Sequence, residues 1–220
     1  MKSYCQFCPI AQALEILAER WTLLVVRELL MGSKRFSELQ RGVPLMSRTL
    51  LSQRLRTLQD VGIVEREESR SGPEYLLTEA GKQLRPILEG IGLWGKRFAH
   101  RRVPDDHLDP MLLMWDMHRR LHTENLPKKR TVVLFRFSDA RKGEQRFWLC
   151  VSTELVDVCY TNPGFDVDLT VDTDVRTLTE VWVGKRALKQ CIRERSVVVE
   201  GDQALKRSFP DWLALSSFAA

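Results

Sequence analysis

The sequence of 220 residues has no run of about 18 consecutive apolar residues, which is the length a helix needs to cross a membrane. Its first residues, MKSYCQFCPIAQAL, lack the positively charged leader and apolar stretch of a secretion signal. We therefore expect a cytoplasmic protein without a membrane partner. At 44% hydrophobic and 29% charged residues, the chain can form one or two packed domains.

Disulfide and catalytic signatures are absent as well. The chain has five cysteines, an odd number, which argues against a disulfide framework and for reduced thiols. It contains no Gly-rich phosphate loop, no G-x-S-x-G and no paired metal-binding motif. We expect no enzymatic activity, no cofactor and no metal site.

Positive charge is concentrated in the first half. Residues 1–102 hold 17 Lys and Arg against 11 Asp and Glu, whereas residues 103–220 hold 17 against 18. Between the halves, VPDDHLDP is polar and bracketed by two prolines, which indicates a linker. We expect a first domain over residues 1–102, a linker over 103–109 and a second domain over 110–220.

Hydrophobic spacing in the first half predicts helices and one β-hairpin. Ser37 can cap the third helix and Ser47 the fourth, while Pro86 and four glycines make the last helix kinked or loose. This order is the winged form of the helix-turn-helix, whose fourth helix here is the candidate for the major groove. The expected helices cover residues 9–17, 20–32, 35–43, 47–62 and 78–102, and the expected strands cover 63–69 and 74–78.

The fourth helix, SRTLLSQRLRTLQDVG, has two different sides. Leu51, Leu55 and Leu58 repeat as on a buried face, with Arg54 beside them, and the opposite side holds hydroxyl, amide and guanidinium groups. Such groups can bond base edges and phosphates, although a solvated helix face is the ordinary alternative. Basic residues around the helix favour DNA. The candidate DNA-binding residues are Lys34, Arg35, Ser37, Ser47, Arg48, Thr49, Ser52, Gln53, Arg56, Arg66 and Arg70.

Several motifs carry a family resemblance. They are Cys8-Pro9, the segments RWT and RFSEL, the helix from Leu51 to Leu58, and LTEAG. Residues 5–98 resemble the HxlR-type winged-helix transcription regulators, which are related to the MarR type. The resemblance implies a homodimer, joined through the first and last helices, that represses by binding a near-palindromic operator in double-stranded DNA. The hairpin turn is shorter here than in many members.

A local pattern also favours dimerisation. The last helix of this half has an apolar stripe with little to cover it inside a small domain, and such a stripe usually finds a partner. The alternative is that it covers the domain's own core or docks on the second domain. The candidate interface residues are Ile10, Leu14, Ile87, Ile91, Trp94 and Phe98.

Cys5 and Cys8 form a C-x-x-C that has no second pair to complete a zinc site. Cys8 precedes the first helix, where the helix dipole favours a reactive thiolate. The family resemblance puts Cys8 forward as a redox-sensing thiol, with Cys5 as its resolving partner. The alternative is an inert cysteine.

The second half alternates helices and strands in the manner of an α+β domain with a mostly antiparallel five-stranded sheet. Over about residues 110–215, and most closely from Asp166 to Leu213, it resembles the sterol carrier protein type of lipid-binding domain, which implies an apolar tunnel for a small hydrophobic ligand. The candidate pocket residues are Trp115, Phe137, Trp148, Leu149 and Trp182, and the alternative is that they fill the core.

Together these patterns predict a homodimeric, DNA-binding transcription repressor controlled by a small apolar ligand in its second domain. Two other functions fit the same sequence. One is a redox-responsive regulator that senses through Cys8 and has a structural second domain. The other is a lipid carrier whose winged helix is a protein-interaction module.

Overall fold

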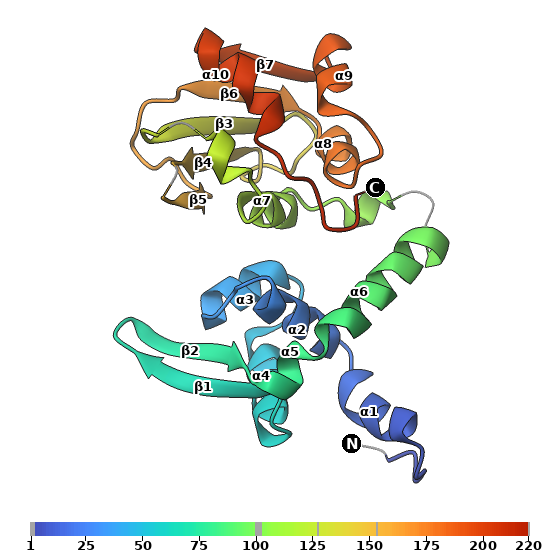
Figure 1. Cartoon of the computed structure of the whole chain (residues 1–220). Helices are drawn as coiled ribbons and strands as arrows, with labels where there is room; N and C mark the ends of the chain where they lie inside the picture. Colours follow the sequence, from blue (N-terminus) through green and yellow to red (C-terminus); the bar gives the residue numbers. More distant parts are fainter. Residues whose placement is uncertain (1–2, 100–102, 127, 153, 220) are drawn as a thin grey trace. The chain divides into compact units, whose positions relative to one another are not determined.

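The computed structural model describes residues 3–99, 103–126, 128–152 and 154–219. The chain forms two compact units, Met1–Ala99 and His100–Ala220, and each is described by itself (Figure 1). The predicted linker, residues 103–109, contains the short helical turn η2 (Asp105–His107). Arg176 of the second unit bonds the carbonyl of Val103 and the carboxylate of Asp105, so part of this segment is tied to that unit.

The first unit is a winged helix, as predicted. Three helices and a two-stranded antiparallel hairpin share a core built on Val25, Leu39, Leu51, Leu55 and Leu58. Its elements are α1 (Pro9–Leu17), α2 (Thr22–Leu30), α3 (Phe36–Gly42), α4 (Arg48–Asp60), β1 (Val64–Ser69), β2 (Gly72–Leu77), α5 (Glu79–Lys82), α6 (Arg85–Trp94) and the π-helical turn η1 (Gly95–Ala99).

Two local predictions for this unit need correction. Ser37 does not cap α3, because the helix begins at Phe36 and the free amides of Lys34 and Arg35 donate to the carboxylate of Glu38 instead. The last helix, expected as one kinked or loose helix over residues 78–102, is instead divided into α5, α6 and η1, and residues 100–102 lie outside the described residues. Pro86, which has no amide hydrogen and lies at the start of α6, explains the break before that helix.

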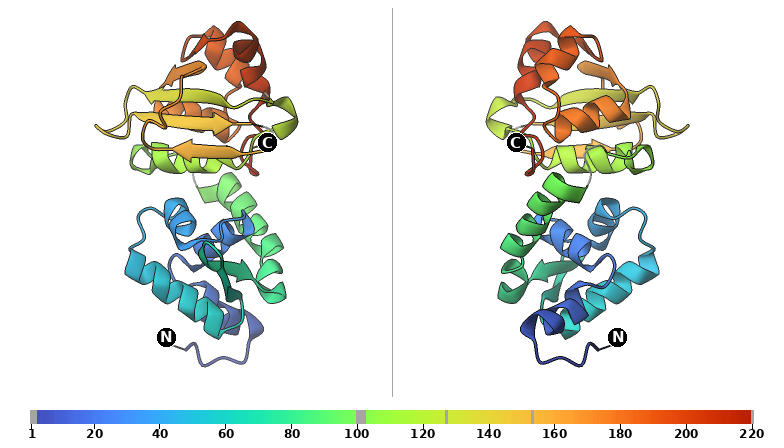
Figure 2. Two further views of the ribbon diagram at one scale, coloured as in Figure 1. Left: turned by 90° about the vertical axis from the view of Figure 1, so that its left-hand side faces the viewer. Right: turned by 90° about the vertical axis from the view of Figure 1, so that its right-hand side faces the viewer.

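The second unit is a five-stranded sheet with helices on one face (Figure 2). The helices are α7 (Pro110–His118), α8 (Val175–Trp182), α9 (Leu188–Arg193) and α10 (Gln203–Ser208), with short turns η3 (Thr123–Asn125) and η4 (Phe209–Asp211). The strands are β3 (Thr131–Phe137), β4 (Arg146–Val151), β5 (Val156–Cys159), β6 (Leu169–Thr173) and β7 (Val197–Gly201), in the order β5-β4-β3-β6-β7.

The sheet is mixed, and the prediction of a mostly antiparallel sheet is wrong. β3, β4 and β5 form an antiparallel meander, but the chain then returns to the far side of β3 and enters β6 parallel to it. β7 pairs antiparallel with β6 at the other edge. Alternating hydrophobicity marks a strand without fixing its direction, so the sequence could not distinguish the two arrangements.

The five predicted pocket residues do not line one cavity. Trp148 and Leu149 are consecutive on β4, so their side chains point to opposite faces of the sheet. Trp115, Phe137, Leu149 and Trp182 belong to the packed core between sheet and helices. The alternative interpretation, in which these large side chains fill the core, fits the structure better. Among the described residues, no helix is long and apolar enough to span a membrane.

Candidate nucleic-acid interface

A buried carboxylate on α2 fixes α3 in place. Glu28 of α2 is fully buried, and its carboxylate accepts from the guanidinium of Arg27 and from the hydroxyl of Ser33. Arg27 also donates to the carbonyl of Gly42, at the end of α3. A methyl group on Gly42 would lie 1.9 Å from the carboxyl carbon of Glu28. Glycine is therefore required where α2 and α3 approach each other.

Helix α4 follows α3 after a short turn, and its sequence explains its placement. The side chain of Ser47 accepts from the amide of Leu50 and caps the helix, as predicted. Leu51, Leu55 and Leu58 are fully buried in the unit's core. The polar candidates lie together on the opposite side of the helix, where each is exposed or half-buried. They are Arg48, Thr49, Ser52, Gln53 and Arg56.

The arginines of α4 have different surroundings. Arg54 is only 14% exposed, and it binds the carboxylate of Glu19 at 2.7 Å and the carbonyl of Arg20. Arg48 is exposed, and its guanidinium lies 5.1 Å from the centre of the Phe36 ring. No carboxylate among the described residues pairs with Arg48 or Arg56. Arg54 therefore holds α4 to the end of α1, and the other two remain available to a ligand.

The start of α3 is tied to the wing, the hairpin β1–β2. The amide of Tyr75 donates to the carbonyl of Lys34 at 2.7 Å. Arg35 bonds the hydroxyl of Ser71 at the hairpin turn and lies 3.9 Å from the carboxylate of Glu74. Arg35 thus braces the wing, a role that the sequence analysis missed because the bond joins residues 36 positions apart. Lys34 and Ser37 are exposed nearby.

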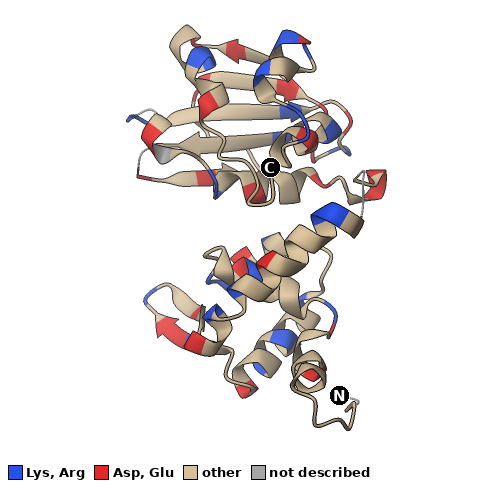
Figure 3. Cartoon of the chain, turned by 45° about the vertical axis from the view of Figure 1, so that its right-hand side comes forward, with Lys and Arg blue, Asp and Glu red and all other residues tan. Residues whose placement is uncertain are grey.

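The wing is more acidic than its two arginines suggest. Glu65, Glu67 and Glu68 lie on β1, where Figure 3 shows acidic segments along the strand. Arg66 pairs with Glu68 at 2.8 Å, whereas Arg70 is exposed at the turn. The turn has two residues, because Ser69 pairs directly with Gly72. Within the described part of the chain, the wing therefore offers an unpaired positive charge only at its tip, at Arg70.

The candidate dimer residues are all exposed within the first unit. Helix α6 has no buried residue, and Trp94 and Phe98 at its end are 62% and 60% exposed. These two rings contact each other, with centroids 5.7 Å apart. Ile10, Leu14, Ile87 and Ile91 are exposed as well. Such a concentration of exposed apolar side chains is unusual for an isolated unit.

The cysteines divide between the two units. Cys8 is the N-cap residue of α1 and is half-buried, while Cys5 is exposed with a left-handed backbone (φ 52°). In the second unit, burial and the nearby Cys159 thiol raise the pKa of Cys150 to about 11. Among the described residues, no group of three or more His, Cys, Asp or Glu side chains could hold a metal ion.

The first unit has recognisable relatives. The HxlR-like helix-turn-helix family matches residues 16–103. The HTH-type transcriptional regulator YvaP of Bacillus subtilis is 43% identical over 93 residues, which are 40% of this chain and 86% of YvaP.

This chain belongs to the HxlR family. A second relative of this HxlR-family protein is the regulator YodB of Bacillus subtilis, 34% identical over 96 residues, or 42% of this chain and 86% of YodB. The solved structure of reduced YodB is 31% identical and covers 43% of this chain and 97% of that chain, with a TM-score of 0.39.

Proposed function

We propose that this HxlR-family protein is a transcription repressor that binds a near-palindromic operator as a homodimer. The observation that carries the proposal is the exposed side of α4, where guanidinium, amide and hydroxyl groups gather without a carboxylate partner among the described residues. A helix of this composition suits the major groove, where Arg bonds guanine and Gln bonds adenine in pairs of hydrogen bonds.

The dimer part of the proposal is supported by the apolar face of α6 and the exposed side chains of α1. Covering Ile87, Ile91 and Trp94 with a second copy would remove apolar surface from water, which favours association. A two-fold dimer would present two α4 helices to half-sites about one DNA turn apart. We propose repression because the resemblance to the HxlR family implies it. The protein would act in the same compartment as the DNA that it binds.

The test is operator binding by matched variants. We expect Arg48→Ala and Gln53→Ala each to weaken binding to the protein's own upstream DNA by about 1–3 kcal/mol, or roughly 5- to 150-fold. Fluorescence anisotropy at fixed salt measures the loss. Gln59→Ala is the control, because Gln59 lies in the last turn of α4, far along the helix from its N-terminal residues, which contact base edges in this motif.

Two outcomes would contradict the proposal. Wild-type affinity in both variants would mean that α4 does not read the DNA. No duplex binding by the intact protein at low salt would remove DNA as the partner and leave the winged helix as an interaction module, because phosphate contacts strengthen as salt falls.

A redox function through Cys8 is the second candidate, favoured by its position at the N-cap of α1 beside exposed Cys5. Diamide treatment should then modify Cys8 and weaken operator binding, and Cys8→Ser should remove the response while leaving the untreated affinity unchanged. Mass spectrometry and anisotropy on the same samples measure both. Unmodified Cys5 and Cys8 together with unchanged binding would end this candidate.

A further inference from the structure

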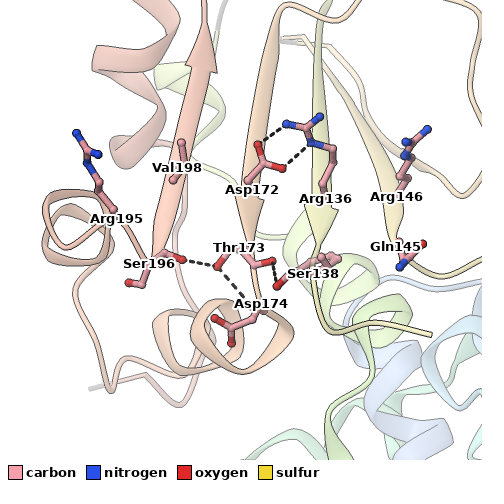
Figure 4. Close-up of a pocket in the computed structure, with 11 residues that line it drawn as sticks. Arg136, Ser138, Gln145, Arg146, Asp172, Thr173, Asp174, Arg195, Ser196 and Val198 are labelled. Atoms are coloured by element: carbon pink, nitrogen blue, oxygen red, sulfur yellow. Dashed lines mark hydrogen bonds and ion pairs between the residues drawn. The ribbon is translucent and has the colours of Figure 1, made fainter. Parts of the chain in front are cut away.

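The second unit has a cleft of about 520 Å³ at the end of its sheet where the parallel strands β3 and β6 terminate (Figure 4). Its floor is a row of side chains on the face that the helices leave uncovered, namely Arg146, Arg136, Asp172 and Val198 from four neighbouring strands. In sheets with parallel strands, ligands commonly bind beyond the carboxyl ends of those strands. None of these residues belongs to the DNA-binding unit.

The positive charges of the cleft exceed the carboxylates that can neutralise them. Arg146 lies directly opposite Arg136 on the adjacent strand, an arrangement of like charges that is unfavourable by itself. Arg136 is neutralised by Asp172, whose two carboxylate oxygens accept from its guanidinium. No carboxylate among the described residues pairs with Arg146.

The second acid of the cleft is also committed. Asp174 caps α8, and its carboxylate accepts from the amide and the hydroxyl of Thr177. Arg195 lies on the opposite side of the cleft from Arg146 (Figure 4). Arg195 likewise has no carboxylate partner in the described part of the chain. Two exposed guanidiniums thus border one cleft in which Asp172 is ion-paired with Arg136 and Asp174 caps a helix.

The backbone of Arg195 is a further sign that its side chain is used. It holds φ at 61°, just after α9, where its amide donates to Ile192 and the amide of Ser196 donates to Cys191. This left-handed position at a helix end is usually glycine, and a side chain there costs free energy. The sequence nevertheless places a long cationic side chain at the rim of the cleft.

We propose that this cleft binds a small anion, whose carboxylate or phosphate oxygens are held by Arg146 and Arg195. Guanidinium groups present paired donors that match the oxygens of both anions. The ion pair with Asp172 holds Arg136 in place between the two walls. The exposed side chain of Val198 supplies an apolar contact for the body of the ligand. This binding does not depend on DNA binding by the first unit.

Isothermal titration of the full-length protein with citrate and with inorganic phosphate, at constant ionic strength, tests the proposal. We expect saturable binding of at least one anion, and its identity separates carboxylate from phosphate recognition. Arg146→Gln and Arg195→Gln should each weaken it at least tenfold. Arg141→Gln, an exposed arginine of the same unit outside the cleft, and Arg48→Ala, on the DNA-binding helix, should keep wild-type affinity.

Arg195→Gly gives a sharper variant, because a purely structural role and a binding role predict different outcomes. Glycine relieves the left-handed backbone, so the midpoint of thermal unfolding should rise while anion affinity falls at least tenfold. Either of two results would overturn the proposal. One is no saturable binding of citrate or phosphate, and the other is wild-type affinity in both Arg146→Gln and Arg195→Gly.

Discussion

The two halves of the chain carry the same number of basic residues, 17 each, but they differ in how these residues are balanced. The first half has 11 acids, and no carboxylate among the described residues pairs with Arg48 or Arg56 on the polar side of α4. In the second half 18 acids face them, and ion pairs such as Arg136–Asp172 and Arg186–Glu194 neutralise guanidiniums within the unit.

The difference shows that counting charges identifies a candidate surface but not the residues that act on it. Each half also contains arginines whose pairing differs from that of most basic residues in the same half. Arg27 and Arg54 of the first unit are bound to Glu28 and Glu19, so they serve the fold. Arg146 and Arg195 of the second unit have no carboxylate partner among the described residues. Paired arginines should therefore affect stability, and unpaired ones should affect binding.

The largest effect is expected where the carboxylate partner of an arginine is fully buried, as Glu28 is. Gly42→Ala would place a methyl group on the carboxylate of Glu28 and disturb its bond to Arg27, so we expect a loss of about 2–4 kcal/mol of unfolding free energy. Urea unfolding measures it. Gly90→Ala is the control, because nothing lies within 4 Å of the added methyl group, and it should be neutral or stabilising.

An intermediate effect should separate the two arginines of α4 that differ in pairing. Arg56→Ala should lower the slope of log K against log salt for operator binding by about 1, as expected for one lost phosphate contact. Arg54→Ala should leave this slope unchanged and instead lower stability by about 1 kcal/mol or less, since its partner Glu19 is half-exposed. The reverse pattern would contradict the division between paired and unpaired arginines.

The smallest effect is expected in the wing. Glu68→Gln removes both a negative charge and the partner of Arg66, so operator affinity should rise by less than about 1 kcal/mol at low salt. Anisotropy titrations at two salt concentrations would detect the change, which should shrink at the higher salt. An unchanged affinity at low salt would mean that β1 stays away from the DNA and that contact is limited to the turn at Arg70.

Much of the first unit could be predicted because its signals are local. The spacing of Leu51, Leu55 and Leu58, the cap at Ser47 and the short hairpin each depend on neighbouring residues. Even the position of Arg54 beside the apolar stripe follows from the helical repeat. The bracing of the wing by Arg35 could not be predicted, because its partner Ser71 is far away in the sequence.

The second unit was predicted less completely for the same reason. The alternation of apolar and polar residues predicts its strand segments. The parallel pairing of β3 with β6, however, depends on the path of the chain from β5 back to the far side of β3, which leaves no local pattern in the sequence. The predicted apolar pocket failed because Trp148 and Leu149, adjacent in sequence, must face opposite sides of the sheet.

By itself, the sequence determined the winged helix, the polar side of α4 and the excess of positive charge in the first half, since each follows from periodicity, capping or composition. Only the tertiary structure decided which guanidiniums are already neutralised. Ion pairs such as Arg54 with Glu19 and Arg136 with Asp172 join residues about 35 positions apart, which packing alone brings within hydrogen-bond distance. The cleft between Arg146 and Arg195 exists for the same reason, because it lies across four strands whose order the sequence does not state.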